Sequence, residues 1–234
     1  MVKNRILFIN FKSVIMKKVC ILLFLFGSFH VSGIAQSEKY MKAMEDKVSQ
    51  VEQARTVEKW LELSNSFERI AVAEKDQWLP FYYAALSRVM MGNLMANGQQ
   101  GGFADKTDPE ADKAELFLEK ASALTKENSE IWCLKKMIAT LRMMADPMTR
   151  FQTYGMAASD ALQKAKQLDP QNPRPYLLEG QDTFYTPEQF GGSKTEAKKL
   201  FEESIKKQES FKPLSSIHPN WGMGQAKYFY SLSQ

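Results

Sequence analysis

A recurring pattern of small and bulky residues constrains the fold of this chain more than any other feature of its sequence. In two places an alanine ends the pattern and an aromatic residue follows eleven positions later, from Ala121 to Trp132 and from Ala165 to Tyr176. The four copies are Leu63, Phe67 and Ile70 before Phe81; Ala114, Leu118 and Ala121 before Trp132; Ala158, Leu162 and Ala165 before Tyr176; and Ala197, Phe201 and Ser204 before Trp221. Residues at i, i+4 and i+7 share one helix face, and mixed small and large side chains let a second helix approach closely. The pattern therefore predicts stacked helical hairpins, because one hairpin cannot cover its own apolar face.

The rest of the sequence is also typical of helices. Runs rich in Ala, Leu, Glu, Lys and Met are separated by short Pro, Gly or Asp signals, and start signals include Asp108-Pro109, Asp146-Pro147 and a capping box from Ser193 to Glu196. The predicted helices lie near residues 37–53, 56–74, 78–95, 109–125, 129–144, 147–168, 174–184, 193–208 and 220–231.

Over roughly residues 56–232 the pattern resembles the tetratricopeptide repeat (TPR), in exported bacterial form. In that family the first helix of each hairpin carries an early aromatic residue and a small residue four positions later, and Ala85 and Gly180 take the small place here, whereas Lys136 and Gln225 depart from it. The early aromatic residues are Phe81, Trp132, Tyr176 and Trp221. The resemblance implies an all-α, TPR-like solenoid of about four helical hairpins, with Trp221 to Leu232 as a C-terminal capping helix.

The spacing departs from the family in one respect. The family repeats every 34 residues or so, but the aromatic positions here are 51, 44 and 45 residues apart. The extra residues fall between the two helices of a hairpin, at Gly92 to Ala111, Arg142 to Tyr154 and Thr183 to Gly192. Insertions in such stacks often form loops on the binding face.

The resemblance also implies a partner-binding groove on the inner face of the first helices. Its predicted lining is Tyr82, Leu86, Met90, Met137, Leu141, Gln181, Phe184 and Tyr185. A surface rich in methionine and aromatic residues suits an amphipathic helix, an apolar peptide or a lipid-like ligand, because flexible thioethers adapt to irregular apolar shapes. The same residues are equally compatible with a filled core.

Signals for catalysis and metal binding are sparse after residue 36. His218 is the only histidine there and lies in a loop between Pro213 and Pro219, with no nucleophile motif around it. Cys133 directly follows the repeat aromatic residue Trp132, so we expect its thiol to be buried and chemically inert. The acidic residues from Asp105 to Asp112 do not follow the Asp-x-Asp-x-Asp-Gly order of a calcium-binding loop. We therefore expect no catalytic residues, no metal and no cofactor, and hence no enzyme.

The N-terminus has the three parts of an export signal. Lys17 and Lys18 precede the apolar run Val19 to Phe26, and small residues lead to Ala35. We predict a signal peptide over residues 1–35, with Met16 as the expected start of translation, and one TPR-like helical repeat domain over 36–234. The apolar run is too short for a stable membrane span. The domain carries 26 basic and 27 acidic residues, so nucleic acid is not an expected partner.

These observations lead to a functional expectation with one alternative. The leading interpretation is an exported, periplasmic or cell-surface adaptor that binds a protein or peptide in the apolar groove. The alternative is a periplasmic accessory protein of a transport system that binds an apolar small molecule or lipid.

Overall fold

A computed structural model of the protein describes residues 32–96 and 101–233, with side chains from residue 38 onward. Within these ranges every regular element is a helix, which confirms the predicted all-α fold class. The chain divides into two units, Met1–Lys42 and Ala43–Gln234. The first unit holds the beginning of α2, and the contacts described below belong to the second unit.

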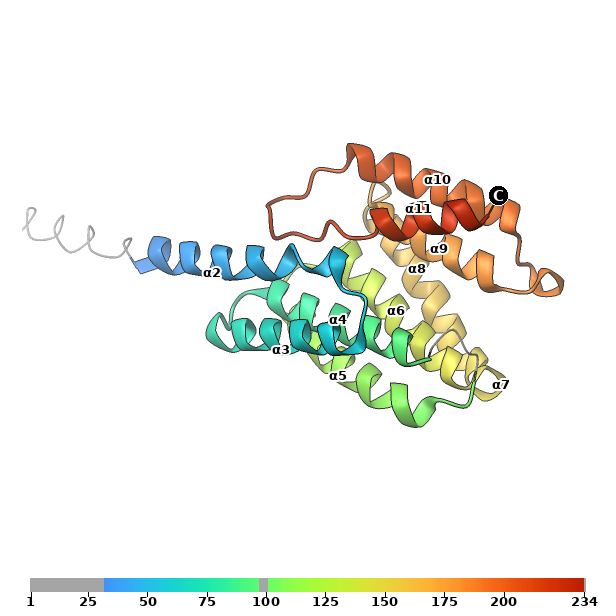
Figure 1. The fold of residues 1–234 in the computed structure, drawn as a ribbon, viewed down its shortest axis with the longest axis horizontal. Helices are drawn as coiled ribbons and strands as arrows, with labels where there is room; N and C mark the ends of the chain where they lie inside the picture. Colours follow the sequence, from blue (N-terminus) through green and yellow to red (C-terminus); the bar gives the residue numbers. More distant parts are fainter. Residues whose placement is uncertain (1–31, 97–100, 234) are drawn as a thin grey trace, which may run out of the picture. The chain divides into compact units, whose positions relative to one another are not determined.

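The helices match most of the predicted ranges (Figure 1). In chain order they are α2 (Ser32–Val48), η1 (Val51–Gln53), α3 (Val57–Ala73), α4 (Trp78–Ala96), α5 (Ala104–Ala123), α6 (Ser129–Ala145), α7 (Pro147–Arg150), η2 (Phe151–Gly155), α8 (Met156–Leu168), α9 (Pro173–Tyr185), η3 (Glu188–Phe190), α10 (Lys194–Ser210) and α11 (Met223–Leu232). The long helix predicted over residues 147–168 is divided, because η2 is a π-helical turn between α7 and α8.

Side-chain caps fix the starts of several helices. Thr56, Asn128 and Ser193 each accept a hydrogen bond from the backbone N–H three positions later, at distances of 3.1 to 3.2 Å. These bonds satisfy donors that the first turn of a helix leaves without a partner. The predicted start at Ser193 is therefore confirmed.

The start of α5 differs from the prediction. The helix begins at Ala104, so Pro109 lies inside it and Asp108 is not its cap. Phe103 is buried against Ala145 in a small core cluster, which anchors the segment one turn earlier than the Pro signal indicates. The Asp108 carboxylate instead accepts two hydrogen bonds from the Arg150 guanidinium, at 2.7 and 2.8 Å.

Neighbouring helices in the chain pack against each other. Helix α4 packs between α3 and α5, α6 contacts α5 and α8, and α10 packs between α9 and α11. Gly180 makes the close approach of α9 to α10 possible, since a Cβ atom there would lie 2.6 Å from the Phe201 ring. Gly180 therefore occupies the small position that the sequence pattern predicts.

A long connection without a helix joins α10 to α11 over residues 211–222, and we call it the strap (Figure 1). The indole N–H of Trp221 donates to the Tyr82 hydroxyl at 2.8 Å, and the backbone N–H of Gly222 donates to Glu52 at 2.7 Å. Within the strap itself, the Ile217 side chain is buried. The strap covers part of the face on which the sequence predicts a groove.

A buried ion pair joins α6, α9 and the strap. Arg174 is fully buried and lies 2.6 Å from the Glu130 carboxylate, which also accepts hydrogen bonds from Tyr82 and Asn172. Burial lowers the pKa of Arg174, but the Glu130 charge and hydrogen bonds more than offset it, so the pKa is raised. Such a pair stays charged, and removing one partner would leave an uncompensated charge in the core.

The predicted export signal lies outside the described residues except for its last four, which open α2. In the described part of the chain, no helix has both the length and the apolar character needed to cross a membrane.

Candidate functional site

The structure separates the predicted groove residues into two groups. Tyr82, Leu86, Met137 and Leu141 are buried. The strap covers Tyr82 through Trp221, and all four side chains belong to the core of this structure rather than to an accessible lining. These four side chains therefore do not line an open groove.

The remaining predicted residues are more accessible. Met90, Gln181 and Phe184 are partly buried, and Tyr185 is 58% exposed. Three of these four belong to α9, near its C-terminal end. The accessible part of the predicted site therefore lies toward the C-terminal helices.

At this place five aromatic side chains from α9, α10 and α11 form a cluster, which we call the aromatic end. Its members are Phe184, Tyr185, Phe201, Tyr228 and Phe229. Phe229 is central, because its ring centroid lies 5.4 to 5.7 Å from those of the other four. Most of these ring pairs meet edge to face, the arrangement that aromatic quadrupoles favour.

The aromatic end is not a closed core, because two of its members are largely exposed. Tyr185 is 58% and Tyr228 is 60% exposed, whereas Phe201 is fully buried beneath them. Phe190 in η3 and Leu232 near the end of α11 add further exposed apolar surface in the flanking segments. Contiguous exposed apolar groups often mark a ligand or partner site.

Two positive charges border the aromatic end. The Lys194 ammonium lies 5.6 Å from the Phe184 ring centroid, and the Lys198 ammonium lies 5.3 Å from the ring centroid of Tyr230 on α11. Partial burial, with a further contribution from the neighbouring Tyr228, raises the pKa of Tyr185 above its ordinary value. The Tyr185 phenol is therefore neutral at pH 7. The surface combines flat apolar rings with cations at its border.

Sequence reasoning identified only part of this surface. It named Phe184 and Tyr185, but it missed Tyr228, Lys194 and Lys198. Helix α11 was interpreted only as a cap, although three consecutive aromatic residues at 228–230 indicate that one helix face cannot bury them all. The two lysines carry no comparable signal in the sequence.

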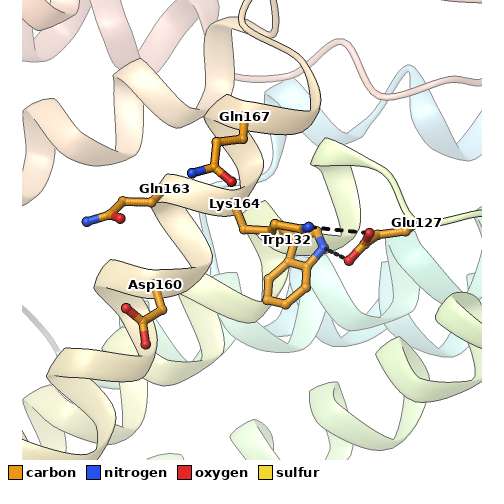
Figure 2. A pocket seen from close by; sticks show the side chains of 6 residues that line it. All are labelled: Glu127, Trp132, Asp160, Gln163, Lys164 and Gln167. Carbon is orange, nitrogen blue, oxygen red and sulfur yellow. Dashed lines mark hydrogen bonds and ion pairs between the residues drawn. The ribbon is translucent and has the colours of Figure 1, made fainter.

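A second surface feature is a shallow hollow beside Trp132 (Figure 2). Its lining is Glu127, Trp132, Asp160, Gln163, Lys164 and Gln167. The Trp132 indole N–H donates to Glu127 at 3.0 Å, and the Lys135 ammonium lies 4.1 Å from the ring centroid. Trp132 is the one apolar group among these six lining residues. The hollow therefore suits an apolar ligand less well than the aromatic end does.

Cys133 and His218, the two residues considered for catalysis, are both held in contacts within the fold. Cys133 is fully buried, and burial raises the pKa of its thiol well above the ordinary value. His218 shares a 2.8 Å hydrogen bond with the Ser215 hydroxyl within the strap, and its ring lies against Trp78. Among the described residues, no group of three or more His, Cys, Asp or Glu side chains is placed to hold a metal ion.

Comparison with known proteins shows a similarity to a solved structure. No protein-family model and no curated protein matches the chain. A solved structure, the HusA haemophore from Porphyromonas gingivalis, is 33% identical, with a TM-score of 0.72. The match covers 83% of this chain and 92% of the HusA chain. The chain belongs to the family of the HusA haemophore.

Membership in the HusA family corrects two expectations. The TPR resemblance is supported only as a helical fold, since no repeat-family model matches. The main functional interpretation, an adaptor for a protein or peptide, is wrong, because the HusA relative is by name a haem carrier. The burial of half of the predicted groove gives a physical reason: an apolar face that packs into its own core has no capacity for a partner helix. The alternative, a small-molecule-binding protein, is the better of the two.

Proposed function

We propose that this protein binds haem or a related iron porphyrin and carries it, as a haemophore. The observation behind the proposal is the relationship to the HusA haemophore, at 33% identity over 83% of the chain. This function is binding rather than catalysis. The predicted leader over residues 1–35 is consistent with an exported carrier, and N-terminal sequencing of the secreted protein would test its removal after Ala35.

We place the ligand at the aromatic end. A porphyrin is a wide, flat, apolar ring system, and exposed Tyr185 and Tyr228 beside Phe229 offer flat apolar surface of matching character. Aromatic rings stack or meet edge to face with a gain beyond the area that they bury. Because Phe201 is buried under Phe229, with the two rings stacked 5.4 Å apart, the exposed rings rest on a packed support.

The test is an absorbance titration of the purified protein with ferric haem. The wild type is expected to give a saturable shift of the main haem band. A double variant, Tyr185→Ala with Tyr228→Ala, should bind about 30-fold more weakly, since two lost aromatic contacts of roughly 1 kcal/mol each correspond to about that factor. Both side chains are exposed, so the fold should be retained.

The matched control is Trp132→Ala, which removes a large aromatic side chain from the other surface feature. This control should bind haem like the wild type. Absence of saturable binding by the wild type would overturn the proposed function. Equal affinity of the wild type and the double variant would instead overturn the placement of haem at the aromatic end.

A further inference from the structure

Two lysines on one face of α10 stand apart from the other lysines of that helix. Lys194 and Lys198 are four residues apart, so their side chains are neighbours on the helix surface. Each ammonium lies over an aromatic ring at the C-terminal end of the molecule, Phe184 for Lys194 and Tyr230 for Lys198. Neither lysine has a carboxylate within 4.0 Å among the described residues.

The other lysines of α10 are paired. Lys199 lies 2.8 Å from Glu196, and Lys207 lies 3.2 Å from Glu203. Glu202 follows Lys198 by one turn, but its carboxylate bonds Lys206 at 2.9 Å. Glu196, Glu202 and Glu203 thus form their ion pairs with other lysines, although the Glu202 charge also acts on Lys198 at longer range. Two like charges remain neighbours on α10 without a direct carboxylate partner.

This arrangement is unfavourable for the isolated helix. Like charges at i and i+4 repel each other, and Lys194 is the first residue after the N-cap, where the helix dipole disfavours a cation. The contacts of the two ammonium groups with the Phe184 and Tyr230 rings offset only part of this cost, because an aromatic ring carries no net negative charge. Departures from local rules that are not fully compensated are expected at functional sites. A ligand that brings negative charge would supply the missing compensation.

We infer that Lys194 and Lys198 bind the two carboxylates of a planar aromatic ligand that rests on the aromatic end. The inference builds on the proposed haem-binding function and deepens it, because haem carries two propionate groups on one edge of its ring. Neighbouring positions on a helix, with Cβ atoms about 5 to 6 Å apart, suit two carboxylates that leave one edge of a macrocycle. The ligand class is therefore a planar aromatic dicarboxylate, oriented with its charged edge toward α10.

The experiment compares ferric haem with its dimethyl ester, which has the same ring but no carboxylate charge. Dissociation constants are measured for the wild type, Lys194→Gln, Lys198→Gln and the double variant, at low and high salt. Each single variant should weaken haem binding roughly fivefold and the double variant roughly 20-fold, as expected for partly exposed ion pairs. Binding of the ester should not change, and the salt dependence of haem binding should disappear in the double variant.

Lys207→Gln is the matched control, because it removes the same charge from the same helix. The Lys207 ammonium lies over the Tyr176 ring near the start of α9 and pairs with Glu203, away from the aromatic end. If this control weakens haem binding as much as the double variant does, a general charge effect replaces the inference. If the double variant binds haem like the wild type, the role of the two lysines is wrong and the proposed function stands. If the wild type binds neither haem nor the ester, the proposed function itself fails.

Discussion

Two tryptophans that the sequence pattern treats as equivalent should differ sharply in their contribution to stability. Trp132 and Trp221 both occupy the early aromatic place of a repeat. Trp221 is 4% exposed, and its indole N–H bonds the Tyr82 hydroxyl, whereas Trp132 is partly exposed and bonds an exposed carboxylate. The structure therefore places Trp221 in the core and leaves Trp132 partly exposed, although both occupy the same place in the pattern.

The magnitude follows from the buried area. A buried tryptophan removes about 200 Å² from water, which at about 25 cal/mol per Å² corresponds to roughly 5 kcal/mol. Alanine retains part of this gain, so Trp221→Ala should lower the free energy of unfolding by about 4 kcal/mol. Trp132→Ala should lower it by about 1 kcal/mol, because solvent already reaches the ring.

The assay is urea unfolding followed by circular dichroism at 222 nm, with the wild type and both variants measured in parallel. The midpoint should move far more for Trp221→Ala, while the slope m should stay constant because the fold is the same. In a thermal melt the larger loss corresponds to a drop of about 8 to 16 °C for a domain of this size. Equal losses for the two variants, or a larger loss for Trp132→Ala, would refute the reasoning.

Three further predictions concern the packing and the strap. Gly180→Ala should destabilise the fold by about 1 to 3 kcal/mol, because the new methyl group would clash with the buried Phe201 ring, and chemical denaturation would measure it. Arg174→Ala should cost about 3 to 5 kcal/mol, since Glu130 would stay charged without its partner, and the same assay checks it. Burial lowers the pKa of His218 below its ordinary value of 6.5. The neutral ring is therefore favoured by folding, and stability should fall as the pH drops below about 6.5. His218→Gln should flatten this decline between pH 7 and 5 in a series of thermal melts, and an unchanged slope would exclude the histidine as its origin.

The fold was largely predictable because its signals are local. Capping residues such as Asn128 and Ser193 and the small residue Gly180 act within one helix or between adjacent helices, so their spacing in the sequence carries the information. The start of α5 was missed because Phe103 packs against Ala145, a contact between residues far apart in the chain. The break at η2 was missed because periodicity cannot distinguish a π-helical turn from a continuous α-helix.

The site was less predictable for a similar reason. The groove predicted on the inner face of the first helices includes Phe184 and Tyr185, but it also includes Tyr82, which the strap covers through Trp221. Whether a position near the middle of a helical stack is open depends on a segment more than 100 residues away, and no repeat pattern records that contact. Exposure of Tyr228 likewise depends on which face of α11 packs against α10.

The most direct measurement of the central claim is a map of backbone amide shifts by NMR on addition of gallium protoporphyrin, a diamagnetic analogue of ferric haem. The largest changes are expected at the end of α9, the start of α10 and the second half of α11, around Tyr185, Lys194 and Tyr228. Changes centred on the Trp132 hollow, or no saturable changes at all, would contradict this claim.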